Sequence, residues 1–115
     1  MSGGLRELNV KKDMPTAGDA IKRITYDIRN AKAWGCSAIK IIHGYGSTGG
    51  GGKIRVEARR YLQQQKEKRF IKGYILGEDF SIFNDETRKA FLLCDELRHD
   101  SDLDRHNNGI TIVIL

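Results

Sequence analysis

The stretch from Ser37 to Leu62 constrains the fold more than any other part of this 115-residue chain. It begins with a largely β-branched run, residues 38–43, which predicts a buried strand. A glycine-rich segment follows, and a helical pattern opens at Lys53. A strand, a glycine-rich turn and a helix N-terminus together make a site where backbone N–H groups can meet an anion. The stretch therefore predicts a phosphate-binding loop.

Charge is polarised along the chain. Residues 53–72 carry eight basic and two acidic side chains, whereas residues 78–104 carry nine acidic and three basic ones. The basic part adjoins the glycine-rich segment, which suits a polyanion such as nucleic acid. A solvated, lysine-rich helix face is the alternative explanation. The candidate phosphate contacts in this part are Lys53, Arg55, Arg59 and Arg60.

Strand and helix patterns alternate along the chain. Strands are predicted at residues 5–10, 38–43, 70–76 and 109–115, and helices at about 16–34, 53–68 and from 84 onwards. This order indicates a layered α/β domain with at least one parallel pair of strands. We expect one domain over residues 5–115, preceded by a flexible leader of residues 1–4. No apolar run approaches the ~18 residues of a membrane helix, and a cytoplasmic protein is expected.

Several stretches resemble nucleotide- or calcium-binding motifs but lack residues that those motifs require at fixed positions. Residues 44–49 match G-x-G-x-x-G, but Arg69 stands about where a dinucleotide site needs an acidic residue. A Walker loop is excluded because Ile54, and not a hydroxyl residue, follows Lys53. The alternating aspartates of residues 100–104 lack the glycine and glutamate of a calcium loop, and we interpret them as a solvated acidic loop. No nucleotide cofactor and no metal are therefore expected.

His43 stands at the carboxyl end of the central strand, beside the glycine-rich segment. An imidazole there could act as a general acid or base, or could contact a phosphate. A histidine at a strand end is also often structural, so both interpretations stay open.

The residues resemble the Smr (small MutS-related) domain family. Residues 41–46, Ile-Ile-His-Gly-Tyr-Gly, with Ile54-Arg55 opening the next helix, resemble its HGxGxG…LR signature. Residues 107–115 resemble its closing GGxGxTxVxL strand, and Trp34-Gly35 also fits. The resemblance spans residues 5–115. It implies a two-layer α/β sandwich with a mixed sheet of about four strands, like the C-terminal domain of bacterial translation initiation factor three. It also implies DNA or RNA binding, with endonuclease activity in some members.

The chain departs from this family at its first strand. The family usually opens with Leu-Asp-Leu-His-Gly, whereas residues 8–12 read Leu-Asn-Val-Lys-Lys. Asn9 therefore replaces a carboxylate that could serve as a base or a metal ligand, and Lys11 stands in the place of the histidine. A second departure is an apparent insertion around residues 77–104, which carries an extra helix. We therefore predict nucleic-acid binding, with an endonuclease as the alternative.

The predicted nucleic-acid contacts gather around the glycine-rich segment. Lys11 and Lys12 should join them if their strand neighbours the central one, because parallel strands end at the same edge. Tyr45 is predicted to stack on an unpaired base. Backbone approach to phosphate is predicted at Gly44, Gly46 and residues 49–52. In the nuclease alternative, His43 would be catalytic, with Asp13 as a possible carboxylate partner. A third possibility is a protein partner held by the acidic helix at 85–100.

Overall fold

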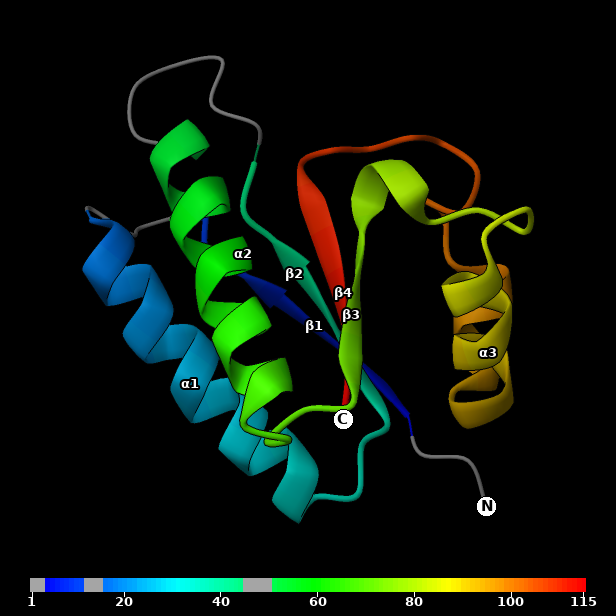
Figure 1. The fold of residues 1–115 in the computed structure, drawn as a ribbon, viewed down its shortest axis with the longest axis horizontal. Helices are drawn as coiled ribbons and strands as arrows, with labels where there is room; N and C mark the ends of the chain where they lie inside the picture. The colour runs from blue at the N-terminus through cyan, green and yellow to red at the C-terminus, as the bar shows by residue number, and fades with distance from the viewer. Residues whose placement is uncertain (1–3, 12–15, 45–50) are drawn as a thin grey trace.

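The computed structural model describes residues 4–11, 16–44 and 51–115. The described chain forms four strands, three α-helices and two short 3₁₀ segments (Figure 1). In chain order they are β1 (Leu5–Asn9), α1 (Ala17–Ala33), β2 (Ala38–Ile42), α2 (Gly51–Glu67), β3 (Gly73–Leu76), η1 (Gly77–Asp79), α3 (Asp85–Leu93), η2 (Asp95–His99) and β4 (Ile110–Ile114).

The strands form one mixed sheet in the order β1-β2-β4-β3. β1 pairs with β2 in parallel, and β4 pairs antiparallel with both β2 and β3. Consequently β1, β2 and β3 all end, and β4 begins, at one edge of the sheet. We call this edge the carboxyl edge.

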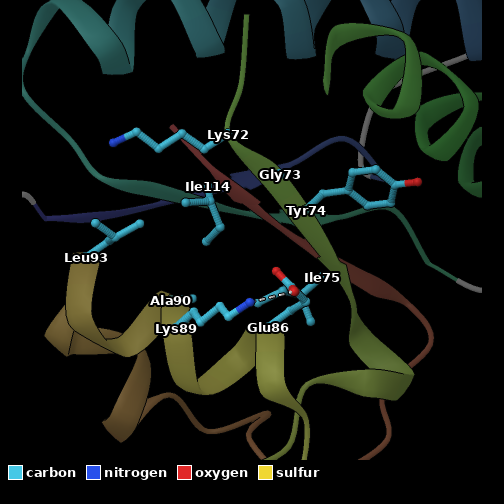
Figure 2. A pocket seen from close by; sticks show the side chains of 9 residues that line it. All are labelled: Lys72, Gly73, Tyr74, Ile75, Glu86, Lys89, Ala90, Leu93 and Ile114. Atoms are coloured by element: carbon cyan, nitrogen blue, oxygen red, sulfur yellow. Dashed lines mark ion pairs between the residues drawn. The ribbon is translucent and has the colours of Figure 1, made fainter. Parts of the chain in front are cut away.

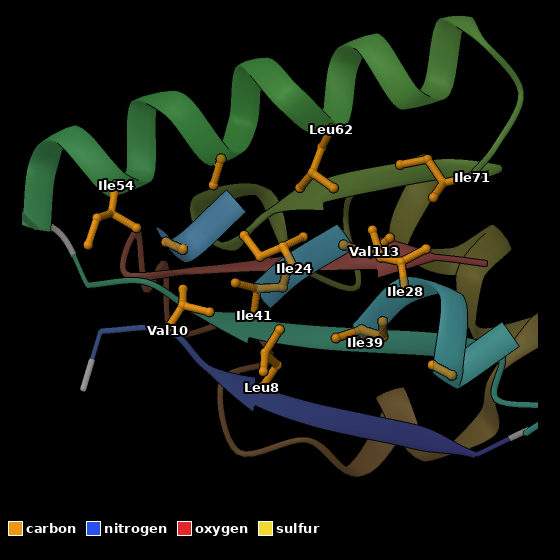
Figure 3. Close-up of a cluster of buried hydrophobic side chains, with 13 residues drawn as sticks. Leu8, Val10, Ile24, Ile28, Ile39, Ile41, Ile54, Leu62, Ile71 and Val113 are labelled. Carbon is orange, nitrogen blue, oxygen red and sulfur yellow. The ribbon is translucent and has the colours of Figure 1, made fainter. Parts of the chain in front are cut away.

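Helices α1 and α2 cover one face of this sheet. Strand side chains alternate between faces, so Ile39 and Ile41 of β2 point toward these helices. The buried cluster between the two layers is shown in Figure 3; its labelled members include Leu8, Ile24, Ile28, Ile54, Leu62 and Val113. This apolar layer holds α2, and therefore its N-terminus, against the carboxyl edge.

The opposite face of the sheet is covered by α3 and η2 (Figure 1). Ala38, Ile75 and Ile112 pack there against Phe80, Phe91 and Leu97. The predicted mixed sheet of four strands with two main helices is confirmed. α3 and η2 form a third layer, so the central strands β2 and β4 are covered on both faces, which explains why both are almost wholly apolar.

Both ends of α1 and the start of α3 agree with the predicted boundaries, and local chemistry explains them. The Thr16 hydroxyl accepts a hydrogen bond of 3.1 Å from the backbone N–H of Asp19 at the start of α1. Gly35 follows that helix with a φ of +80°, as a terminating glycine should. Asn84 caps α3 by accepting from the N–H of Thr87 at 2.9 Å.

One predicted element is divided. The acidic stretch 85–100 is not a continuous helix, because α3 ends at Leu93 and Cys94 adopts an extended conformation before η2. Within the described residues, no helix has the length and apolar character needed to cross a membrane.

Candidate nucleic-acid interface

β1 and β2 deliver their following residues to the same place. Asn9 is the register partner of Ile42, the last residue of β2. The backbone N–H groups of Val10 and Lys11 both donate to the carbonyl of Ile42, at 2.9 and 3.2 Å. Lys11 therefore lies beside the residues that leave β2, as the prediction of neighbouring parallel strands required.

Gly44 and Lys11 are in close contact at this edge. Gly44 has a φ of +74°, in the left-handed region that favours glycine. A Cβ added there would lie 3.3 Å from Cδ of Lys11, so the aliphatic part of the lysine lies over the glycine backbone. The N–H groups of His43 and Gly44 both donate to Gly109 O, at 3.0 and 2.9 Å. The start of the glycine-rich segment is thus held at a defined position.

The first turns of α2 bring basic side chains to the same edge. Lys53 is exposed and Arg55 half-buried, and the first turn of the helix contains no acidic residue. Arg60 is also exposed, but its Nη1 lies 3.3 Å from Oε1 of Glu57, a surface pair that partly offsets its charge. Five of the predicted contacts lie outside the described residues, namely Lys12, Tyr45, Gly46 and residues 49–50, and so does Asp13.

His43 is fully buried beneath this edge. Its Nδ1 lies 2.8 Å from Gly44 O, which can only accept, so Nδ1 carries the proton. Its Nε2 lies 2.8 Å from Oγ1 of Thr111 and therefore accepts from that hydroxyl. Both ring nitrogens are satisfied inside the protein. A phosphate contact or proton transfer by His43 would require this arrangement to open.

Burial, together with the positive charges of Arg59 and Arg55, lowers the pKa of His43 to about 4, against the raising effect of the Gly44 hydrogen bond. The imidazole is therefore neutral at physiological pH. A neutral ring cannot supply positive charge for an anion, so the charge at the edge comes from lysine and arginine.

Arg59 has a different environment from the one predicted for it. Its guanidinium forms two hydrogen bonds with Glu78, at 2.9 and 2.7 Å, and donates from Nε to Thr111 Oγ1 at 3.1 Å. It also donates to Ile110 O at 3.2 Å. The pKa of Glu78, which burial alone would raise, is lowered by this arginine. These bonds join α2, η1 and β4, so Arg59 acts as a structural link, with its charge largely neutralised.

The interpretation of residues 100–104 as a solvated acidic loop was wrong for Asp100 and Asp102, whereas Asp104 is exposed. Nζ of Lys40, in the central strand β2, lies 3.0 Å from Oδ1 of Asp100 and forms a second ion pair with Asp102. Lys40 is 4% exposed. Burial lowers its pKa, but the two aspartates more than offset this and raise the pKa above its usual value. Asp100 and Asp102 therefore hold their loop against the sheet by neutralising a buried cation.

The structural role of Lys40 was missed because the other residues of 38–42 are all apolar and predict a buried strand. Its position between Ala38 and Ile42 places it on the α3 face. A lysine on the buried face of a central strand requires a partner carboxylate. This requirement could have indicated an ion pair between Lys40 and an acidic residue elsewhere in the chain.

The acidic charge of the segment after β3 is also largely paired. Asp85 pairs with Arg88, Glu86 with Lys89 at 3.5 Å, and Asp95 with Arg98 at 2.8 Å. The described part of the chain contains no group of three histidine, cysteine or carboxylate side chains arranged to hold a metal ion.

A shallow groove of about 200 Å³ lies between β3 and α3, away from the carboxyl edge (Figure 2). Its apolar walls are Ile75, Ala90, Leu93 and Ile114, and the Glu86–Lys89 pair lies at its margin. Gly73 leaves space beside it, since a Cβ there would meet no atom within 4 Å.

The arrangement of layers is shared with a solved structure. The crystal structure of the Smr domain of Thermus thermophilus MutS2 superposes with a TM-score of 0.59 and 18% sequence identity, over 96% of each chain. No protein-family model and no curated protein matches the sequence. The fold is therefore that of an Smr domain.

Proposed function

We propose that this chain is a divergent Smr-type domain that binds DNA or RNA at the carboxyl edge. The observation that carries the proposal is that Lys11, in contact with the left-handed Gly44, lies at the same edge of the sheet as the first turns of α2, which carry Lys53 and Arg55 (Figure 1). Among the described residues, no carboxylate forms an ion pair with any of these three side chains. A cationic edge beside a helix N-terminus matches the chemistry of a phosphate backbone.

The role proposed for each residue depends on whether its side chain is exposed or buried. Lys11, Lys53 and Arg55 contact phosphates. His43 keeps Gly44 and Thr111 in place through its two hydrogen bonds, and is a positioning residue. Lys12, Tyr45 and Gly46 keep the roles predicted for them, as contacts from segments that flank the described edge. The cytoplasmic location and the insertion at residues 77–104 also stay predictions.

Binding measurements across salt concentrations test the proposal. Labelled single-stranded and duplex DNA and RNA would be titrated with the wild type and with Lys53→Ala/Arg55→Ala. We expect weaker binding in the double variant and a salt dependence reduced by about 1.4 in slope for single strands, since each phosphate contact contributes about 0.7.

A charge-matched control is Lys66→Ala/Lys68→Ala, which removes two exposed cations from the far end of α2. The proposal requires this control to lose less affinity than Lys53→Ala/Arg55→Ala. Equal losses would show that net charge alone governs binding, and absence of wild-type binding at low salt would exclude the function.

The endonuclease alternative has less support, because both nitrogens of His43 are engaged and its pKa is low. Nicking of a supercoiled plasmid that disappears in His43→Ala would nevertheless establish it.

A protein-binding function has one favourable observation, the groove in Figure 2 with the exposed Leu92 and Leu93 on α3. A partner of that surface would still bind Lys53→Ala/Arg55→Ala and would be lost in Leu93→Asp.

A further inference from the structure

The outward surface of α1 carries cations and aromatic rings, and its one exposed carboxylate is Asp19 in the first turn. Lys22, Arg23, Tyr26 and Arg29 are all exposed, with Tyr26 at 65%. Positions 22, 26 and 29 are spaced four and three residues apart, so they form one stripe about 10 Å long. The stripe lies opposite the buried side of the helix, which includes Ala20, Ile24 and Ile28.

The carboxylate within this part of α1 is removed from the surface. Asp27 is 1% exposed and forms an ion pair of 2.8 Å with Arg6 of β1. Between residues 20 and 34 it is the single acidic residue in the sequence. Among the described residues no ion pair neutralises Lys22, Arg23 or Arg29. With three exposed cations against one exposed carboxylate, Asp19, the surface keeps a net positive charge.

Trp34 lies at the C-terminal end of the same helix and is 63% exposed. The guanidinium of Arg6 lies 5.0 Å from the centre of its ring and also binds Asp27. This contact holds the indole in position while most of it stays open to solvent. A large apolar ring kept at the surface beside cations has the character of a stacking platform.

We propose that this surface, formed by Lys22, Arg23, Tyr26, Arg29 and Trp34, binds an unpaired stretch of the nucleic acid whose phosphates reach the carboxyl edge. The inference rests on the proposed function and specifies its substrate class as single-stranded or partly single-stranded. Helix α1 begins at the carboxyl edge and runs away from it (Figure 1). A strand bound at that edge can therefore continue along α1, with a base on Tyr26 and phosphates at Lys22 and Arg29. Stacking requires unpaired bases, which a duplex does not offer.

The experiment compares 20-nucleotide oligo(dT) and oligo(U) with a 20-base-pair duplex by fluorescence anisotropy. Tyr26→Ala should weaken single-strand binding about 5- to 150-fold, the range for one stacked base, and change duplex binding much less. Tyr26→Phe should retain wild-type affinity because it keeps the ring. Lys22→Ala/Arg29→Ala should reduce the single-strand salt slope by about 1.4.

Phe83→Ala is the matched control, since Phe83 is an aromatic residue with 85% exposure in the segment that leads into α3. It should bind as the wild type does. Trp34, the sole tryptophan, gives a second readout, and its emission should be quenched by the single strands.

The inference is overturned if Tyr26→Ala loses no more affinity than Phe83→Ala, or if single strands and duplex weaken equally. Retained sensitivity to Lys53→Ala/Arg55→Ala in that case would leave the carboxyl-edge function standing. Absence of wild-type binding to every nucleic acid would remove both proposals. Binding to phosphatidylserine vesicles that depends on Tyr26 and Lys22, without nucleic-acid binding, would identify α1 as a membrane-surface helix instead.

Discussion

The Nε2 atom of His43 lies 2.8 Å from Oγ1 of Thr111, and that same oxygen accepts a hydrogen bond from Arg59. One hydroxyl group therefore joins the end of β2, the strand β4 and the helix α2. Each donor in the series has an acceptor: Arg59 donates to Thr111, Thr111 to His43, and His43 to Gly44. The series fixes both the tautomer of the ring and the position of the backbone that begins the glycine-rich segment.

Thr111→Val should destabilise the protein by about 1–3 kcal/mol, because it leaves a buried imidazole nitrogen and a guanidinium N–H without their partner. Thr111→Ser keeps the hydroxyl and should lose much less. Urea unfolding of the two variants and the wild type measures the difference. Equal losses in both variants would mean that the methyl group, and not the hydrogen bonds, carries the effect.

Stability should fall as the pH is lowered from about 6.5 to about 4. The folded protein holds the pKa of His43 near 4, while the unfolded chain has the ordinary value of 6.5. Between these values the unfolded state binds the extra proton, so acidification favours unfolding, by up to the order of 3 kcal/mol. Above 6.5 this contribution is fully present.

Denaturant unfolding at pH 7.5, 6, 5 and 4 tests the contribution of His43. His43→Gln should be less stable than the wild type at pH 7.5, and its stability should depend less on pH in this interval. An unchanged pH profile in His43→Gln would show that other groups cause the dependence.

Gly77→Ala should prevent stable folding or lower the unfolding free energy severely. A Cβ at Gly77 would lie 1.9 Å from the backbone oxygen of Asn107 and 2.6 Å from Ile110 O, neither of which can move without disturbing β4. Gly73→Ala is the control, because the same added atom there meets nothing within 4 Å. Thermal unfolding should separate the two variants clearly, and similar melting temperatures would contradict the close packing of η1 on β4.

Lys40→Met should cost about 3–5 kcal/mol, because it leaves Asp100 and Asp102 near a buried face without their cation. Lys89→Met removes an exposed lysine from an ion pair with Glu86 and should change stability little. Restoration of Lys40→Met by the added changes Asp100→Asn and Asp102→Asn would confirm that the unpaired carboxylates are the cause.

Local features of this fold could be predicted because their causes lie within a few residues. The Thr16 and Asn84 caps, the terminating Gly35 and the apolar strands at 38–42 and 110–114 all follow from neighbouring side chains. The adjacency of Lys11 and Gly44 could also be predicted, since it needed only that β1 and β2 be parallel neighbours.

The remaining features depend on residues far apart in the chain. Lys40 and Asp100 are 60 positions apart, and Arg59 and Thr111 are 52 positions apart. Arg59 and Arg60 are adjacent and chemically identical, yet one is bound inside the protein and the other is exposed. Nothing in the local pattern separates them, because the difference arises from where η1 and β4 place Glu78 and Thr111.

The position of β4 between β2 and β3 has a consequence for how the protein is made. During synthesis β2 has only β1 to pair with, and β3 emerges with no partner, because β4 is the last of the four strands in sequence. The edges of β2 and β3 that pair with β4 therefore stay unpaired until residues 110–114 have been synthesised. Nascent chains stalled before Ile110 should aggregate readily and bind chaperones, however stable the complete domain is.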